Sequence, residues 1–363
     1  MSKAARSTYD STLAFFSRHS QFSGSFQFCK ASTPSIPGWP KPLLTLDIPQ
    51  CDWLGSLGVN SGAAEPEITH IAAGHGHALI AFRGVGGAES VFAIGRNESG
   101  QLGIGYNSQE PTRGLVEGFG GDYIEELQCG ITSSYLRVKQ GDQSVVYACG
   151  NQNRGQLGIP PALTQGDRPL QSFTSRATIV SPPGASVQQL ATGFEHALIL
   201  SDGKLFGTGV NTDGQLGMSD DVDRLTFSEI SIPTQLIEDG IASVHAGADT
   251  SAFISNEGDL WTFGNSEYAQ AFHGKIIDRI LEPKLMDWAL IGLPKVKSFC
   301  TGGSFSLLLN EQGLVYAAGY GSIGQQSNVL QATKPVIISG LKQITQIHAG
   351  AGYAAAVNTY TDD

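Results

Sequence analysis

The chain has 363 residues, of which 40% are hydrophobic, 15% are charged and 46 are glycine. It contains no run of 18 apolar residues, so the sequence predicts no transmembrane span. A formal net charge of −11 and a pI near 5.1 argue against binding to DNA and against broad RNA binding, because both depend on counterion release to a basic surface.

Residues 1–42 differ from the rest of the chain in charge. They hold five of the 22 basic residues and one of the 33 acidic residues, a net charge of +4, which leaves 17 basic and 32 acidic residues, a net charge of −15, in the remainder. The segment is rich in serine, and its apolar and basic stretch at 13–18 is typical of a mitochondrial transit peptide. The alternative is a disordered or strap-like tail.

A seven-residue segment that ends in glycine recurs six times from residue 68 onward. The anchor glycines are 56, 63, 54, 55 and 48 residues apart: Gly74, Gly130, Gly193, Gly247, Gly302 and Gly350. This period is too long for helical hairpin arrays or leucine-rich repeats but suits one four-stranded sheet per unit. The spacing therefore predicts the blades of a β-propeller.

A second signature, Gly-Gln-Leu-Gly, alternates with the anchors. It is nearly identical at residues 100–103, 155–158 and 214–217, and weaker copies lie at 55–58, 264–270 and 319–325. Between the signatures, short apolar runs joined by glycine turns at 201–204, 256–259 and 311–313 predict strand hairpins. Residues 9–22 and 276–291 could each hold a short helix, but the pattern as a whole predicts an all-β chain.

The alternation of Ala-Gly-x-x-His with Gly-x-Asn-x-x-Gly-Gln-Leu-Gly resembles the repeat of the regulator of chromosome condensation family, from about Trp53 to Tyr360. The resemblance implies a β-propeller, usually of seven blades. Six units are detectable, so we expect six or seven blades in a single propeller over residues 43–363. We also expect a ring closed by both chain ends, with residues 26–28 or 43–46 pairing with residues 353–360.

The degenerate copies at 55–59, 263–270 and 319–324 resemble the mitochondrial branch of that family. This implies a role in assembly of the large mitochondrial ribosomal subunit, in a module linked to pseudouridylation of its RNA. It also implies a proposed nucleotide-exchange activity toward a fusion GTPase. We therefore expect a location in the mitochondrial matrix or at the inner membrane, with cytoplasm or nucleus as the alternative. The expected partners are proteins, either mitoribosome assembly factors or a GTPase, bound by a monomer.

Several residue patterns suggest chemistry but have a structural explanation. His75 and His77 could suggest a metal site, yet His77 aligns with His196 at one repeat position, which favours a hydrogen-bonding role inside each blade. Residues 319–324 match the Gly-x-Gly-x-x-Gly dinucleotide pattern without the helix that must follow it. Cys129 and the other cysteines form no C-x-x-C pair. We expect no enzyme active centre, no metal and no cofactor.

Function is then expected at a surface. The longest connection, residues 159–186, suggests a partner-binding face with Arg168, Phe173 and Arg176, although a tolerated surface excursion is equally compatible. An acidic cluster, Asp220, Asp221 and Asp223, is the best candidate for a nucleotide-exchange wedge, although such clusters are usually solvated edges. Residues 137–139 or 168–176 could form a local basic patch, but direct RNA contact is not favoured. Two functions remain open: a non-catalytic assembly platform, or a guanine-nucleotide exchange factor.

Overall fold

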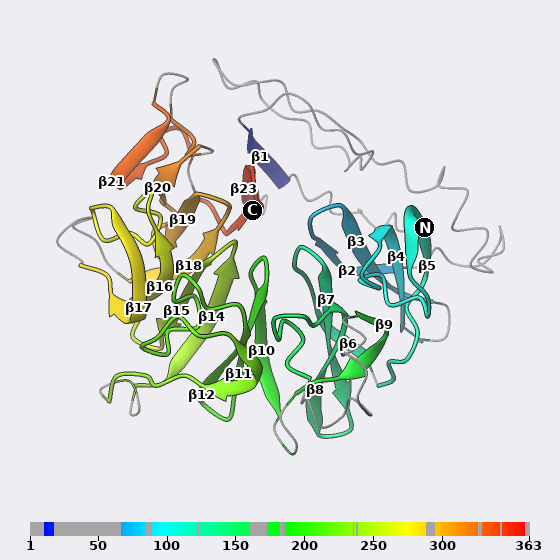
Figure 1. Ribbon diagram of the computed structural model, residues 1–363. Helices are drawn as coiled ribbons and strands as arrows, with labels where there is room; N and C mark the ends of the chain where they lie inside the picture. Colours follow the sequence, from blue (N-terminus) through cyan, green and yellow to red (C-terminus); the bar gives the residue numbers. More distant parts are fainter. Residues whose placement is uncertain are drawn as a thin grey trace, which may run out of the picture. The chain divides into compact units, whose positions relative to one another are not determined.

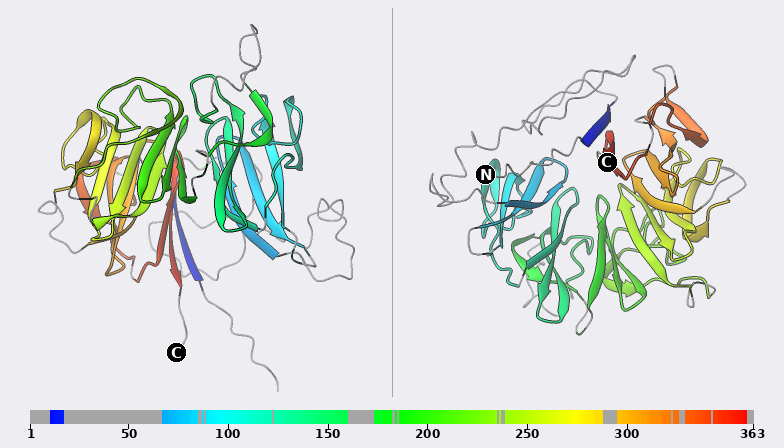
Figure 2. Two further views of the ribbon diagram at one scale, coloured as in Figure 1. Left: turned by 90° about the horizontal axis from the view of Figure 1, so that it is seen from below. Right: turned by 180° about the vertical axis from the view of Figure 1, so that it is seen from behind.

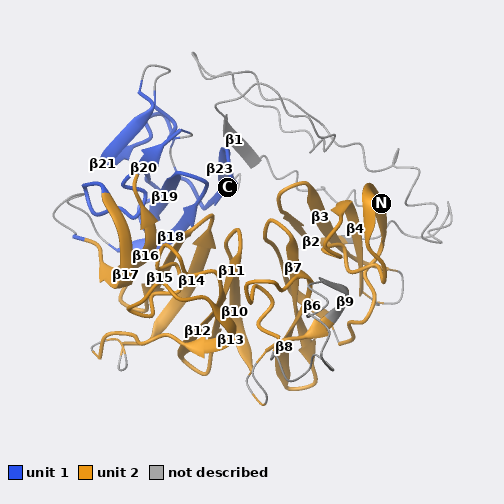
Figure 3. Cartoon of the chain, viewed as in Figure 1, with its two compact units in different colours: residues 1–52, 268–276, 287–363 blue, residues 53–267, 277–286 orange. Residues whose placement is uncertain are grey.

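A computed structural model describes residues 11–17, 67–84, 87, 89–121, 123–159, 173–181, 184, 186–234, 236, 239–287, 295–321, 323–325, 329–341 and 343–359. Two compact units divide the chain (Figure 3): unit 1 comprises residues 1–52, 268–276 and 287–363, and unit 2 comprises residues 53–267 and 277–286. Arg168, Cys29, Cys51 and the candidate closing strands at 26–28 and 43–46 lie outside the described residues.

Unit 2 contains four antiparallel sheets of four strands, labelled in Figure 1. Sheet I has β2 (Glu67–Ala73), β3 (His77–Arg83), β4 (Glu89–Asn97) and β5 (Ser108–Leu115). Sheet II has β6 (Tyr123–Cys129), β7 (Ser133–Gln140), β8 (Gln143–Asn151) and β9 (Phe173–Ile179). Sheet III has β10 (Val187–Thr192), β11 (His196–Ser201), β12 (Lys204–Gly209) and β13 (Arg224–Glu229). Sheet IV has β14 (Ile241–Gly247), β15 (Thr250–Ser255), β16 (Leu260–Ser266) and β17 (Ile277–Leu285).

Unit 1 contains two further sheets. Sheet V has β18 (Val296–Thr301), β19 (Phe305–Asn310), β20 (Val315–Tyr320) and β21 (Gln331–Ile337). Sheet VI has β22 (Gln346–Ala349), β23 (Tyr353–Thr359) and β1 (Ser11–Ser17). Each of the six repeat units thus opens a sheet, as the anchor pattern predicts. No helix among the described residues has the length and apolar character needed to cross a membrane.

Local turn chemistry and tertiary pairing both shape these sheets. The turn between β11 and β12 places Asp202 at φ 50° and Gly203 at φ 74°, the left-handed pair that joins two-residue hairpins. The helices suggested for residues 9–22 and 276–291 were wrong, because these segments contain β1 and β17. β17 pairs with β16 as the fourth strand of its sheet, and this pairing outweighs a weak local helix preference.

Apolar cores lie between successive sheets of the same unit. Leu79 and Val91 of sheet I pack with Leu127 and Leu136 of sheet II in one cluster. A second cluster joins sheets II and III, and a third, in unit 1, joins sheets V and VI. Burial is therefore divided among many small interfaces, which explains how a chain of this length avoids one oversized core.

The anchor glycines lie where neighbouring sheets approach most closely. A Cβ atom built on Gly74 would collide with the carbonyl oxygen of Gly130 in the next sheet and lie 2.7 Å from the His77 ring. Backbone hydrogen bonds also connect successive sheets beside the anchors. Ile131 N donates to Phe194 O, and Phe194 N donates to Ala248 O, both at 2.9 Å. Glycine is required at the anchors by this approach of two backbones.

The two chain ends meet in sheet VI, where β1 and β23 run side by side in both views of Figure 2. The antiparallel register runs from Ser11 opposite Thr359 to Ser17 opposite Tyr353. Pairing between the chain ends was expected, but the strand that pairs comes from residues 11–17 and not from 26–28 or 43–46. The stretch with transit-peptide character is thus part of a sheet.

Candidate functional site

The Gly-Gln-Leu-Gly signature forms the connection between the third and fourth strands of a sheet. In each copy, the side-chain oxygen of an amide residue five positions before the leucine accepts a hydrogen bond from the leucine N–H. The accepting residues are Asn97, Gln152 and Asn211, at 3.0, 2.7 and 2.9 Å. The signature glutamine accepts from the backbone two residues earlier, as Gln215 does from Asp213 N at 2.8 Å. These amide side chains bond the backbone N–H groups that have no partner strand in the connection, so each connection is a fixed turn.

The same turn packs on the fourth strand of the next sheet. A Cβ atom on Gly155, which has φ 83°, would collide with Arg224 O at the start of β13. Thr208 Oγ1 lies 2.8 Å from Gly155 O and 3.0 Å from Arg224 O, so one hydroxyl serves both sheets. The signature is therefore a contact between sheets as well as a turn.

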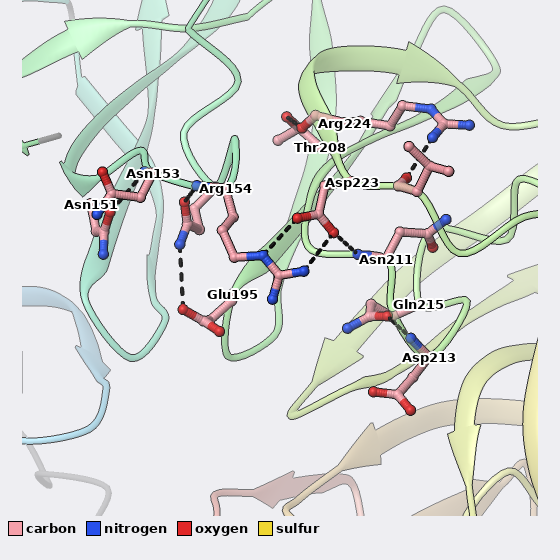
Figure 4. Close-up of polar contacts among 12 residues, drawn as sticks. Asn151, Asn153, Arg154, Glu195, Thr208, Asn211, Asp213, Gln215, Asp223 and Arg224 are labelled. Carbon is pink, nitrogen blue, oxygen red and sulfur yellow. Dashed lines mark hydrogen bonds and ion pairs between the residues drawn. The ribbon is translucent and has the colours of Figure 1, made fainter. Parts of the chain in front are cut away.

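The three predicted aspartates lie together after the third signature, but each is held by an arginine. Asp223 receives two bonds from Arg154, at 2.6 and 2.9 Å, across the interface between sheets II and III (Figure 4). Asp220 pairs with Arg224 at 2.6 Å, and Asp221 pairs with Arg279 of β17 at 3.2 Å.

These ion pairs tie the predicted acidic cluster to neighbouring loops. The hydrogen bond from Arg224 is the main cause that holds the pKa of Asp220 below its usual range. Bidentate geometry makes the Arg154 pair more specific than an ordinary surface pair, although partial exposure limits its contribution to about 1 kcal/mol. The aspartates therefore connect loops of sheets II, III and IV.

A second acidic group was missed by the sequence reasoning. Glu195 and Asp249 follow their anchor glycines by two residues, and Asp213 precedes the third signature, so repeat position was the available signal. Among the described residues, their side chains make long contacts to amides, such as Gln156 Nε2 to Glu195 and Gln215 Nε2 to Asp249, both 3.4 Å. Burial, followed by repulsion from Asp213 and Glu195, raises the pKa of Asp249 to about 6. The carboxyl is thus poised to lose charge in mild acid.

The predicted insertion is shorter than the sequence suggested. Residues 160–172, including Arg168, lie outside the described residues, while Phe173 begins β9 in register with Asn151. Arg176 is exposed, bridges to Ile104 of sheet I and pairs with Glu117 at 3.2 Å. Part of the expected loop is therefore the fourth strand of sheet II. Among the described residues, Arg176 makes no ion pair or hydrogen bond with the aspartate cluster.

The repeat histidines form locks between sheets. His77 Nε2 lies 2.9 Å from Ser134 Oγ, and Ser134 Oγ donates to Gln101 O at 2.7 Å. His196 and Ser251 repeat the arrangement at 2.8 Å. Because the serine proton goes to a carbonyl oxygen, the serine oxygen must accept from Nε2–H, which fixes the tautomer. Hydrogen bonding was predicted, but its partners lie on the next sheet and not within the blade.

Burial keeps these imidazoles neutral and the thiols protonated. Desolvation lowers the pKa of His77 to about 4 and of His196 to about 3, and raises the pKa of Cys129 to about 12. Burial raises the thiol pKa of Cys149 and Cys300 as well. Within the described part of the chain, no group of three His, Cys, Asp or Glu residues could hold a metal ion.

Two other sequence patterns have structural roles. Arg137, from the possible basic patch, is mostly buried between Glu125 and Glu126 at 2.7 and 3.1 Å, so it is not available to a phosphate backbone. The glycine pattern at 319–324 begins in the last two residues of β20, and the chain then leads to β21. The described residues of this connection contain no helix N-terminus that could receive a pyrophosphate.

Comparisons with known proteins agree with the repeat pattern. The family model described as "Regulator of chromosome condensation (RCC1) repeat" matches residues 202–254. The human "RCC1-like G exchanging factor-like protein" is 25% identical over 326 residues, covering 81% of this chain. This chain spans 66% of that relative, just under two thirds. The "Ultraviolet-B receptor UVR8" of Arabidopsis thaliana is 27% identical over 335 residues, covering 87% of this chain and 71% of that protein.

Two crystal structures share the fold. Human WBSCR16 has a TM-score of 0.66 at 20% identity, covering 81% of this chain and 87% of that one. Yeast RCC1 (Prp20), in its complex with Kap60, has a TM-score of 0.66 at 21% identity, covering 82% and 67%. At this level of identity the likeness concerns the fold alone.

Proposed function

The chain belongs to the regulator of chromosome condensation repeat family and has its β-propeller fold, and we propose that it is a rigid, non-catalytic platform for protein partners. The observation that carries the proposal is the use of charged groups at the signature loops. Asp220, Asp221 and Asp223 each engage an arginine, and the pairs with Arg154 and Arg279 cross to a neighbouring sheet. Such loops are preorganised to present a surface.

The buried reactive groups support the same proposal. The His77 and His196 rings are neutral hydrogen-bond donors between sheets, and their serine partners give their own protons to backbone carbonyls. Buried thiols with raised pKa, such as Cys129, hold little of the thiolate form that reacts. Recognition at the loops, and not bond chemistry, is the activity that these residues favour.

The finer proposal places the platform in mitochondria, at assembly of the large ribosomal subunit and its RNA pseudouridylation module. Its support is the basic, serine-rich composition of residues 1–42 and the resemblance of the degenerate repeat copies to the mitochondrial branch. Because β1 belongs to sheet VI, import would have to leave residues 11–17 in the mature chain if the sheet is to keep three strands. A reporter fused to residues 1–45 that stays cytosolic would remove the support for import.

A guanine-nucleotide exchange factor is the second candidate. The human and mouse relatives bear the name "RCC1-like G exchanging factor-like protein". Displacing Mg²⁺ and phosphate from a GTPase requires acidic groups that are not already neutralised. Glu195, Asp213 and Asp249 fit this requirement better than the arginine-paired aspartates, because their side chains contact amide groups of the described residues and not arginines.

Proximity labelling with the full chain, followed by mant-GDP release from purified mitochondrial and Ras-like GTPases, separates the two candidates. The platform predicts reproducible protein neighbours and no acceleration of nucleotide release. Rapid release that is lost in Asp213→Asn and Asp249→Asn variants, with Asp221→Asn as the control, would establish exchange activity. Deleting residues 161–171 tests the insertion without removing β9.

A further inference from the structure

Val222 is the most exposed large apolar side chain among the described residues, at 59%. It lies in the connection of residues 219–223, here called the Val222 loop, between the third signature and β13. Leu225, three residues later on β13, is 46% exposed. Single exposed apolar residues are common on protein surfaces, so the significance of Val222 depends on how its loop is held.

The Val222 loop is fixed from both neighbouring sheets. Ser219 N donates to Leu281 O of β17 at 2.9 Å, and Asp221 pairs with Arg279 of the same strand. On the other side, Asp223 receives the two bonds from Arg154 of sheet II, which Figure 4 shows converging on its carboxylate. A loop held at both ends loses little conformational entropy on binding.

The backbone of Val222 is also satisfied within the loop. Its N–H donates to Asp220 Oδ1 at 3.0 Å, and its carbonyl oxygen accepts from Arg224 Nη1. The Asp220 carboxylate is fixed in turn by Asn211 Nδ2 at 3.0 Å. The backbone of Val222 is thus satisfied within the loop, and Val222 and the arginine-paired Asp221 are side chains that the loop presents to solvent.

The equivalent connection of sheet I has the same organisation. Asn97 Nδ2 donates to Tyr106 O at 2.6 Å, as Asn211 Nδ2 donates to Asp220 O at 2.9 Å. Tyr106 is 52% exposed. Tyr106 thus occupies the position of Asp220, two residues before that of Val222, and an exposed apolar or aromatic side chain lies in both connections.

We infer that the Val222 loop, with Leu225, is a preorganised contact surface for a protein partner that supplies an apolar pocket. This inference rests on the proposed platform function and specifies its surface. Each aspartate of the loop is already matched by an arginine, so the loop offers little uncompensated charge to a basic partner. A rigid apolar anchor surrounded by satisfied polar groups has the organisation of a binding hot spot.

Site-specific photocrosslinking in cells tests the inference. The full chain would carry a benzophenone amino acid at position 222, at position 106, or at the exposed Tyr123 as the control. We expect a defined adduct at 222 that is absent at 123 and lost when Leu225→Asp is added. Equal adducts at 222 and 123, or none at 222, would overturn the inference. Adducts at other loops in that case would leave the platform itself standing.

The partner identified in the adduct is then titrated with the purified full chain. We expect Val222→Asp to weaken binding by about tenfold or more, and raising the salt concentration from about 0.1 to 0.5 M to change it less than about threefold. Ile179→Asp is the matched control, because it places the same charge at another exposed aliphatic residue, on β9 of sheet II. Unchanged binding of Val222→Asp, or a steep salt dependence, would favour a charged partner surface and contradict the inference. Equal melting temperatures of the variants would show that folding is unaffected.

Discussion

Sheet III in unit 2 and sheet V in unit 1 fill the same repeat position with opposite chemistry. Three residues after the anchor glycine, sheet III places His196, which bonds Ser251 of the next sheet at 2.8 Å. Sheet V places Phe305, whose ring packs against the Cα of its anchor, Gly302. Both side chains are about 1% exposed. The position therefore does not fix one chemistry, because a polar or an apolar ring fits over the glycine, and sheets II and IV place the smaller Ser133 and Thr250 there.

The loops beyond this position differ in the same way. Those of sheets III and IV carry carboxylates, among them Asp213 and Asp249, and their amide and arginine partners. In unit 1, Tyr268 and Tyr320 contact each other with ring centroids 5.6 Å apart, and Phe272 meets Phe299 edge to face at 5.7 Å. Polar locks depend on protonation and salt, whereas aromatic contacts do not. The comparison predicts that acid weakens unit 2 before unit 1.

The largest expected effect comes from the feature both units share, the anchor glycine. In Gly193→Ala the new Cβ would lie 2.5 Å from Ala248 O and would overlap the His196 ring. We expect a loss of about 3 kcal/mol in the free energy of unfolding. Urea denaturation measures it. Gly120→Ala, whose Cβ meets nothing within 4 Å, is the control and should change stability by less than about 0.5 kcal/mol.

Replacing His196 of unit 2 with phenylalanine, the residue at the same position in sheet V, should remove the acid sensitivity that this histidine causes. The pKa of His196 is about 3 in the fold and 6.5 in the unfolded chain, so between these values only the unfolded state binds the proton. Stability therefore falls as pH drops from 6.5 toward 3, by up to about 1.4 kcal/mol for each pH unit. His196→Phe should lose about 1 kcal/mol at pH 7 but resist acid better. Parallel pH profiles for the two proteins would contradict this.

Removing β1 tests whether sheet VI depends on the N-terminal strand. A chain lacking residues 1–17 loses all seven paired positions opposite β23, whereas a chain lacking residues 1–10 retains them. We expect hydrogen exchange of the β23 amides to speed up by about tenfold or more in the shorter chain only. Equal protection in both truncations would show that β1 contributes nothing to the sheet.

The smallest expected effect is at Asp249. Its pKa is about 6 in the fold and 3.8 in the unfolded chain, so the folded state binds the extra proton between these values and stability falls as pH rises through them. Asp249→Asn removes this penalty. We expect a gain of about 1 kcal/mol at pH 7, after allowing for solvent screening, and none below about pH 4. Thermal unfolding at the two pH values measures the difference, and an equal gain at both would refute it.

Repetition made the fold readable from sequence, because each unit repeats the same local solution. The anchor segments became the first strands of six sheets, and the turn at Asp202 and Gly203 adopted the left-handed geometry its residues favour. The errors occurred where repetition gave no guidance. Ile277–Leu285 has a local pattern compatible with helix, and its strand pairing with β16 is a contact that a local pattern does not contain.

The site was predicted less well, because position along the chain does not reveal ion-pair partners. Asp223 was correctly placed in a cluster, but its partner Arg154 lies 69 residues away. The sequence therefore indicated an acidic cluster but not the arginines that pair with its three aspartates. Glu195 and Asp249 shared a repeat position that the sequence displayed, yet their mutual repulsion depends on the distance between sheets III and IV.

The sequence by itself determined the repeat, the all-β class and the positions of the anchor glycines, because these follow from local strand and turn patterns at a fixed period. Tertiary structure decided which residue each polar side chain would meet, and so which charges remain available to a partner. The reason is physical: strand and turn preferences act over a few residues, whereas hydrogen bonds and ion pairs between sheets depend on how separate units pack.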